Sequence, residues 1–231
     1  MSQRAFQATL ARLVIDPRFR SRVVARGEVA LGKDLTDIER RRLIAAAAHK
    51  GLDITRTLHN AWRLSKILSM LPFTCALLGQ GRFVREVSAF WRKRLPRSLH
   101  FFEEALAFCD YLDARLRSGL RVTYLEEVVA YERARVELYL SRVTGAPISP
   151  RRVEFRHDPQ RLIDALAAGR RPRRVAEESY VLEGTLAEDG NIRWRVVEGM
   201  RAAEQWDPGG LPSVPDDAAA RPRRPVDSAT H

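Results

Sequence analysis

The 231-residue chain has few of the residues that build disulfide frameworks and thiolate metal sites. It contains two cysteines, Cys75 and Cys109, and both stand in apolar segments with helical periodicity. Two cysteines cannot form a framework of several disulfides, and there is no C-x-x-C pair to bind zinc. We therefore expect a reduced, cytoplasmic protein whose fold depends on its apolar core.

Long apolar runs and catalytic signatures are also missing from the sequence. No stretch approaches the roughly 20 apolar residues that a membrane-spanning helix needs. The N-terminal segment carries Arg4 and Arg12 among its apolar residues, unlike a secretion signal. There is no nucleophile elbow, phosphate-binding loop, dinucleotide fingerprint or H-E-x-x-H pair. We expect no independent active site, no cofactor and no metal in this chain.

Positive charge is what the chain has in excess. It has 40 lysines and arginines against 29 aspartates and glutamates, a formal net charge of +11. Such a charge attracts nucleic acids, acidic peptides and acidic protein surfaces without choosing among them. The basic residues gather at residues 40–42, 82–97, 151–152 and 170–174. A solvated helix face explains each cluster by itself, while their number favours an anionic partner. For such a partner, the second cluster predicts an interface that consists of Arg82, Arg85, Arg92 and Arg94.

Signals for helix starts and ends dominate residues 1–145. Asp16 precedes Pro17, which is typical of a helix N-terminus. The spacing of Thr36 from Glu39, and likewise of Thr123 from Glu126, predicts a capping box at each place. Glycines at positions 51, 79 and 119 mark helix ends. We therefore expect about six helices in this region.

The segment 53–71 has apolar residues at helical spacing, which predicts one broad buried face. We also expect three tryptophans of the chain, Trp62, Trp91 and Trp194, to lie in the core. The apolar positions of the predicted helix are Ile54, Leu58, Ala61, Trp62, Leu64, Ile67, Leu68 and Leu71.

Beyond residue 150 the apolar period changes to two, which is typical of strands. Residues 152–157 predict a strand, and Asp158 with Pro159 predicts a helix that ends near Gly169. Residues 179–186 and 191–198 predict a hairpin around an Asp-Gly turn. The fold class is therefore α+β. We expect a helical domain over 1–145, a strand-helix-hairpin domain over 150–200 and a disordered tail over 201–231.

A two-stranded hairpin leaves an edge that is either covered by its own domain or open to another strand. An extended peptide can add to an open edge through main-chain hydrogen bonds. The side chains that would line such a peptide site are Tyr180, Leu182, Ile192 and Trp194. The alternative is that these residues only pack the small domain onto the helices, and the sequence leaves both interpretations open.

A set of residues in the helical region resembles a known bacterial family. In chain order, these residues form a corner with proline and glycine, a series of spaced aromatic residues, a Tyr-Leu pair and an Ala-Tyr-Glu motif. The matching positions are Pro72, Leu78, Gly79, Phe83, Phe90, Pro96, Phe108, Leu112, Tyr124, Leu125 and 130–132. The region around them resembles the small partner proteins of multinuclear non-haem iron-dependent oxidases, over about half of the chain. The resemblance is to partner subunits of the TglI type, from the 3-thiaglutamate pathway, and more distantly to those of the MbnC type.

The resemblance implies a non-catalytic subunit that forms a heterodimer with the oxidase. In such complexes the oxidase holds the iron, and the partner binds a ribosomally made precursor peptide whose cysteine is modified, a step of RiPP biosynthesis. Related helical proteins have carried a DNA-binding description. The alternative function is therefore a nucleic-acid-binding regulator that uses the basic helical surface.

Overall fold

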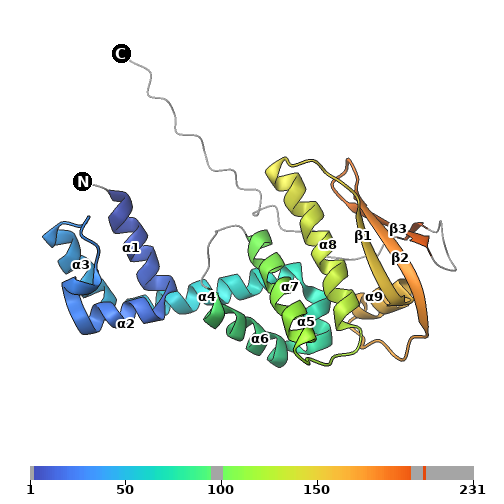
Figure 1. The fold of residues 1–231 in the computed structure, drawn as a ribbon, viewed down its shortest axis with the longest axis horizontal. Helices are drawn as coiled ribbons and strands as arrows, with labels where there is room; N and C mark the ends of the chain where they lie inside the picture. Colours follow the sequence, from blue (N-terminus) through green and yellow to red (C-terminus); the bar gives the residue numbers. More distant parts are fainter. Residues whose placement is uncertain (1–2, 95–100, 199–204, 207–231) are drawn as a thin grey trace, which may run out of the picture. The chain divides into compact units, whose positions relative to one another are not determined.

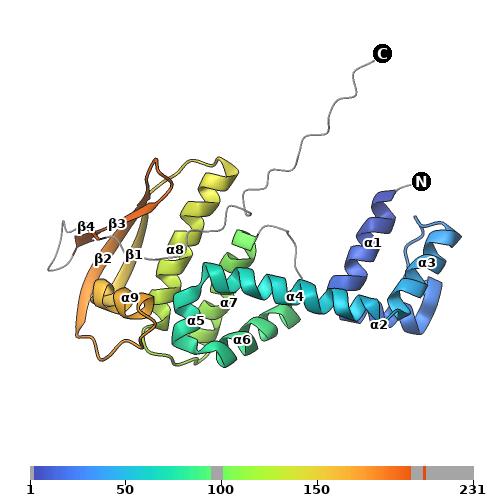
Figure 2. The same ribbon diagram turned by 180° about the vertical axis from the view of Figure 1, so that it is seen from behind.

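The computed structural model describes residues 3–94, 101–198 and 205–206 (Figures 1 and 2). The described residues form helices followed by a small antiparallel sheet, which confirms the predicted α+β class. They belong to two compact units, residues 3–66 with 87–94 and residues 67–86 with 101–198 and 205–206. Of the predicted tail, only the short strand β4 (Gln205–Trp206) lies within the described residues.

The first unit contains α1 (Gln3–Ile15), α2 (Pro17–Arg26), the 3₁₀ helix η1 (Gly27–Ala30) and α3 (Asp37–Ala48). Both predicted helix starts are confirmed. The Asp16 side chain accepts a hydrogen bond from the Phe19 N–H at 2.9 Å, and Thr36 and Glu39 form the expected capping box. The core of this unit is a cluster of buried residues that comprises Leu13, Phe19, Val23, Leu31, Leu35, Leu43 and Ala47.

The long helix α4 (Gly51–Met70) departs from the prediction of one broad buried face. Ile67 and Leu71 are buried as expected, but Ile54, Leu58 and Trp62 are 64%, 65% and 45% exposed. The expectation that Trp62 lies in the core is therefore wrong. Helical periodicity identifies an apolar face, but it does not say whether the same chain covers that face.

Two short helical segments follow α4. Pro72 begins α5 (Pro72–Leu78), and Gly79 ends it with a positive φ of 74°. Helix α6 (Gln80–Lys93) then starts at once, and Gly81 lies within its first turn. Helices α4 and α6 each contribute residues to both compact units.

In the second unit, helix α8 (Leu125–Thr144) is central. It packs against α7 (Phe101–Arg117) and against strand β1 (Arg151–His157), as Figures 1 and 2 show. Tyr131 on α8 is completely buried, and its ring centroid lies 4.7 Å from that of Trp194 and 6.4 Å from that of Phe155. This aromatic cluster joins α8 to the sheet.

The sheet has the order β1-β2-β3-β4, with each neighbouring pair antiparallel. Strands β2 (Glu177–Leu186) and β3 (Ile192–Glu198) form the predicted hairpin, and Gly190 in its turn has a positive φ of 84°. Helix α9 (Pro159–Ala167) connects β1 to β2, with Asp158 at its N-cap as expected. Because α5, α7 and α8 belong to the same compact unit as the sheet, the units do not follow the predicted boundary at residue 145.

The proline corner and the Ala-Tyr-Glu motif of the family resemblance meet in this unit. Glu132 on α8 is completely buried, and its carboxylate accepts the N–H groups of Phe73 at 2.7 Å and Thr74 at 2.9 Å. These N–H groups stand in the first turn of α5, where they have no partner within the helix. Arg135 donates to the carbonyl of Met70 at 3.1 Å, just before the same corner. The motif residues therefore build the junction between α4, α5 and α8.

Candidate functional site

The four side chains predicted to line a peptide site lie in the core of the second unit. Tyr180, Leu182, Ile192 and Trp194 are 4%, 0%, 9% and 1% exposed. They occupy the inner face of the sheet, where Trp194 meets Tyr131 of α8. The prediction that they line an open peptide site is therefore wrong, and the alternative that they pack the sheet onto the helices is correct. Strand alternation marked the buried face, and a buried face cannot receive a peptide.

The edge of the sheet that could receive a strand is β1. Its residues pair with β2 on one side, and the described part of the chain places no strand on its other side. Val153 and Phe155 are buried, whereas Arg152, Glu154 and Arg156 between them are exposed. An edge strand presents unpaired backbone N–H and C=O groups. Strand β1 therefore offers a seven-residue edge with charged side chains on its solvent face.

On the outer face of the sheet, one carboxylate lies between two guanidinium groups. Glu183 on β2 is only 6% exposed and accepts hydrogen bonds from Arg152 Nε at 3.1 Å and from Arg195 Nε at 3.0 Å. The hydrogen bonds from Arg195 and Arg152 lower the pKa of Glu183, so it carries its charge. These contacts join β1, β2 and β3 in one register and keep the edge strand in place.

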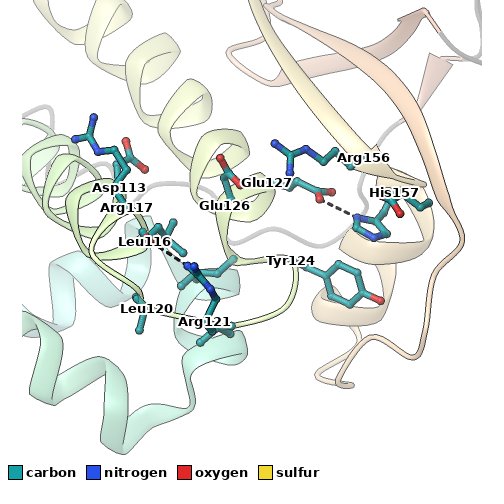
Figure 3. A pocket seen from close by; sticks show the side chains of 13 residues that line it. Asp113, Leu116, Arg117, Leu120, Arg121, Tyr124, Glu126, Glu127, Arg156 and His157 are labelled. Carbon is teal, nitrogen blue, oxygen red and sulfur yellow. Dashed lines mark hydrogen bonds and ion pairs between the residues drawn. The ribbon is translucent and has the colours of Figure 1, made fainter.

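A polar pocket of about 620 Å³ lies at one end of β1 (Figure 3). It is lined by the end of α7, the α7–α8 loop, the start of α8 and the adjoining ends of β1 and β2. Its wall carries both signs of charge, from Asp113, Arg117, Arg121, Glu126, Arg156 and Glu177. A pocket of this kind suits a polar or charged group with several hydrogen-bonding atoms.

One contact between lining residues of the pocket joins α8 to β1. His157 Nδ1 lies 2.8 Å from Glu127 Oε1, and both side chains are largely buried. Burial raises the pKa of Glu127, and the contact with His157 opposes this shift. The other carboxylate oxygen, Glu127 Oε2, has no hydrogen-bond partner among the described residues. This oxygen is itself buried, so it is an unsatisfied acceptor inside the protein rather than part of the exposed pocket wall.

Tyr124 lines the pocket beside His157 and has an unusual backbone. Its φ of 65° places it in the left-handed region, which costs a non-glycine residue about 1–2 kcal/mol. Its hydroxyl donates to the Arg173 carbonyl at 3.2 Å and accepts from the Val175 N–H at 3.0 Å, while its ring meets that of His157 edge-on at 4.8 Å. Tyr124 therefore fixes the segment that leads from α9 into β2.

This geometry corrects one sequence prediction. Thr123 and Glu126 do not form a capping box, because Tyr124 is the N-cap residue of α8 and no side chain caps it. The left-handed Tyr124 turns the chain so that α8 begins at Leu125. No sequence pattern marks a tyrosine for this conformation, although the family resemblance included Tyr124 and Leu125.

Three of the predicted partner-interface arginines, Arg82, Arg85 and Arg92, lie on α6, and Arg94 directly follows its last residue. Arg85, Arg92 and Arg94 are exposed, whereas Arg82 is half-buried. Arg85 and Arg92 are seven residues apart, so they share one face of the helix. Their exposure is compatible with a role in binding an acidic partner.

Within the described residues, no group of three or more His, Cys, Asp or Glu side chains is arranged to hold a metal ion. Iron in a partner subunit stays a prediction. None of the described helices combines the length and apolar character needed to span a bilayer.

Comparisons of the chain with protein-family models, with curated proteins and with solved structures found no match. The family resemblance therefore rests on the motif residues described above. Those that build the junction of α4, α5 and α8 are Pro72 and Glu132.

Proposed function

We propose that this protein is the non-catalytic partner subunit of a multinuclear iron-dependent oxidase, and that it binds the precursor peptide as an added strand on β1. The observation that carries the proposal is the edge of β1, which no other strand of the described residues covers and which ends at a polar pocket. The complex would be cytoplasmic, with the iron held by the oxidase subunit.

The edge and the pocket supply two different parts of peptide recognition. Main-chain hydrogen bonds along a seven-residue strand provide affinity for an extended peptide of almost any sequence. Choice among peptides then needs side-chain contacts. Arg156 and His157 belong both to β1 and to the pocket wall, so a peptide paired with β1 would bring one side chain toward Glu127. A polar or charged side chain fits the pocket wall there, because the wall offers both carboxylates and guanidinium groups.

The proposed site also explains why this chain would need an oxidase partner. The pocket contains an acid and an imidazole, but its described lining offers no cysteine nucleophile and no metal ligands in a group of three. Oxidation of a cysteine needs a redox centre, which this proposal assigns to the other subunit. The role of the present chain is then to hold the peptide while the oxidase modifies it.

Amide hydrogen exchange tests the peptide site directly. The chain is co-expressed with the iron oxidase from its gene neighbourhood, and the complex is examined with and without the cysteine-containing precursor peptide. We expect the peptide to slow exchange at residues 151–157, because their outward N–H groups gain partners, and to leave residues 192–198 unchanged. A peptide that binds without slowing exchange in β1 would overturn this site.

The alternative function, a nucleic-acid-binding regulator, has its own signature. A protein that binds through phosphate contacts loses affinity steeply as salt rises. Binding of the purified chain to random duplex DNA at two salt concentrations measures this dependence. Tight, salt-sensitive DNA binding together with no recovery of the oxidase would favour the regulator over the partner subunit.

A further inference from the structure

The first compact unit carries an exposed apolar stripe on α4. Ile54, Leu58 and Trp62 follow one another at four-residue spacing, so they lie on one face of the helix. Their exposed fractions are 64%, 65% and 45%, and the smaller Ala61 beside them is also exposed. Single apolar residues on a surface need no explanation, whereas neighbouring exposed apolar residues on one helix face are typical of binding surfaces. This set of residues is called the α4 stripe below.

The charge of the chain is concentrated in the same unit. Residues 3–66 contain 14 lysines and arginines against six aspartates and glutamates. Residues 67–86 and 101–198, which belong to the second unit, contain 18 of each. The α4 stripe is therefore an apolar surface on a strongly basic body, whereas the proposed peptide site lies on a body with balanced charge.

This combination specifies the chemistry of the partner. A second copy of this chain would bring a second basic body toward the first, and like charges oppose such a contact. Nucleic acid would pair with the cations, but Ile54, Leu58 and Trp62 cannot neutralise phosphates. An acidic protein surface with an apolar groove satisfies both features, because an amphipathic helix can place apolar side chains at i, i+4 and i+8 into such a groove.

We propose that the α4 stripe is the surface through which this protein docks onto the oxidase subunit, with Trp62 and Leu58 as its apolar anchors. The identity of the partner rests on the function proposed above. The surface itself rests on the exposure of the stripe and on the basic charge of its unit. Buried aromatic anchors carry much of the energy of such contacts.

Two variants and a matched control test the docking surface. Leu58→Asp and Trp62→Ala alter the stripe, while Val29→Asp introduces the same acid at an apolar residue that is 88% exposed in η1 of the same unit. Each tagged variant is co-expressed with the oxidase, and the recovered oxidase and its iron are measured. We expect each stripe variant to weaken the complex by roughly tenfold or more, since loss of one anchor commonly costs that much. Val29→Asp should bind as the wild-type chain does.

Folding and peptide binding are measured on the same variants. Circular dichroism should be unchanged for all three, because the substituted side chains are exposed. Slowed hydrogen exchange in β1 on addition of the precursor peptide should also persist, since the peptide site lies in the other unit. Loss of oxidase binding with peptide binding retained would establish the stripe as the docking surface.

The outcomes separate this inference from the proposed function. If the wild-type chain binds the oxidase and both stripe variants bind equally well, the docking surface is wrong and the partner function stands. If the wild-type chain does not bind the oxidase, the partner function fails, and the docking surface that depends on it fails too. Two other results would overturn the inference. If the wild-type chain binds vesicles of anionic phospholipid and Leu58→Asp abolishes this binding, the stripe is a membrane surface. If the wild-type chain forms a dimer that Leu58→Asp abolishes, the stripe binds a second copy.

Discussion

Trp194 and Gly184 face each other across strands β2 and β3, and the indole ring covers the glycine. A Cβ atom on Gly184 would lie 2.7 Å from the ring of Trp194, closer than such atoms approach in real proteins. The Trp194 ring also meets that of Tyr131 of α8, with 4.7 Å between the ring centroids. The absence of a side chain at Gly184 therefore allows the sheet to pack closely on the central helix.

Replacing Gly184 with alanine should destabilise the second unit. The added methyl group must displace a fully buried indole ring, and overpacking of this kind costs about 1–3 kcal/mol. Urea unfolding followed by tryptophan fluorescence would measure the loss in the free energy of unfolding.

The matched control is Gly81→Ala in the same unit. Gly81 lies in helix α6 with its nearest contact at an ordinary 3.8 Å, so alanine should keep or increase stability by up to about 1 kcal/mol. Equal effects at the two glycines would contradict the role assigned to the Trp194 ring.

The parts of the fold that the sequence predicts are those with local signals. The starts of α2, α3 and α9 depend on a side chain that accepts from an N–H two or three residues away, and such pairs are visible in the sequence. The β2–β3 hairpin likewise depends on its Asp-Gly turn. The burial of the apolar face of α4 cannot be predicted in this way. It depends on whether other elements pack against Ile54 and Leu58, and no local sequence pattern encodes such packing.

The buried carboxylate of Glu132 should make stability depend on pH. Burial raises its pKa from 4.5 to about 6, although Arg135 and the N–H groups of Phe73 and Thr74 oppose the shift. The folded state therefore binds this proton more tightly than the unfolded state does. The stability from Glu132 is complete below pH about 4.5 and is lost as pH rises through about 6, a change of about 2 kcal/mol.

Glu132→Gln tests this dependence, because the amide does not titrate. Urea unfolding of both proteins at several pH values between 4 and 7 should show the extra decline only in the wild-type chain. Burial also raises the pKa of Glu127. Glu127 is present in both proteins, so its effect on the free energy of unfolding cancels in the comparison. Parallel stability curves for the two proteins would show that Glu132 does not change its ionisation on folding.

Removing the hydroxyl of Tyr124 should loosen the segment before β2. Tyr124→Phe keeps the ring against His157 but leaves the Arg173 carbonyl and the Val175 N–H without their partner. These hydrogen bonds are exposed and part-buried, so their loss should cost about 0.5–1.5 kcal/mol. We expect faster amide exchange at Val175, measured by hydrogen exchange with mass spectrometry. Unchanged exchange there would mean that the segment is held by other contacts.

The candidate site was harder to predict from the sequence than the fold was. Glu127 and His157 are 30 residues apart and meet only because α8 packs along β1. The sequence did predict the period-two strands, and from them an edge that could accept a peptide. It assigned that role to the most apolar side chains, whereas in an edge strand the backbone is what is available to a partner.

Charge reversal on α6 should affect the oxidase complex in a different way from the α4 stripe. Arg85→Glu and Arg92→Glu together change two exposed cations on one helix face. Exposed charges steer association, and their effect is screened beyond about 10 Å at 0.1 M salt. We therefore expect the association rate with the oxidase to fall about tenfold at low salt, and much less at high salt. Leu58→Asp should instead raise the dissociation rate at both salt concentrations, because it removes an apolar anchor that the oxidase would bury in the complex.

The control for charge reversal is Arg193→Glu, at a side chain that is 61% exposed on β3. Each such substitution changes the net charge of the chain by the same amount. Arg193 belongs to the sheet, however, and is far from α6 in the sequence. Rates measured by surface plasmon resonance at two salt concentrations distinguish the two roles. If Arg193→Glu slows association as much as the α6 reversals do, the net charge of the chain steers the encounter, and the arginines of α6 form no specific partner surface.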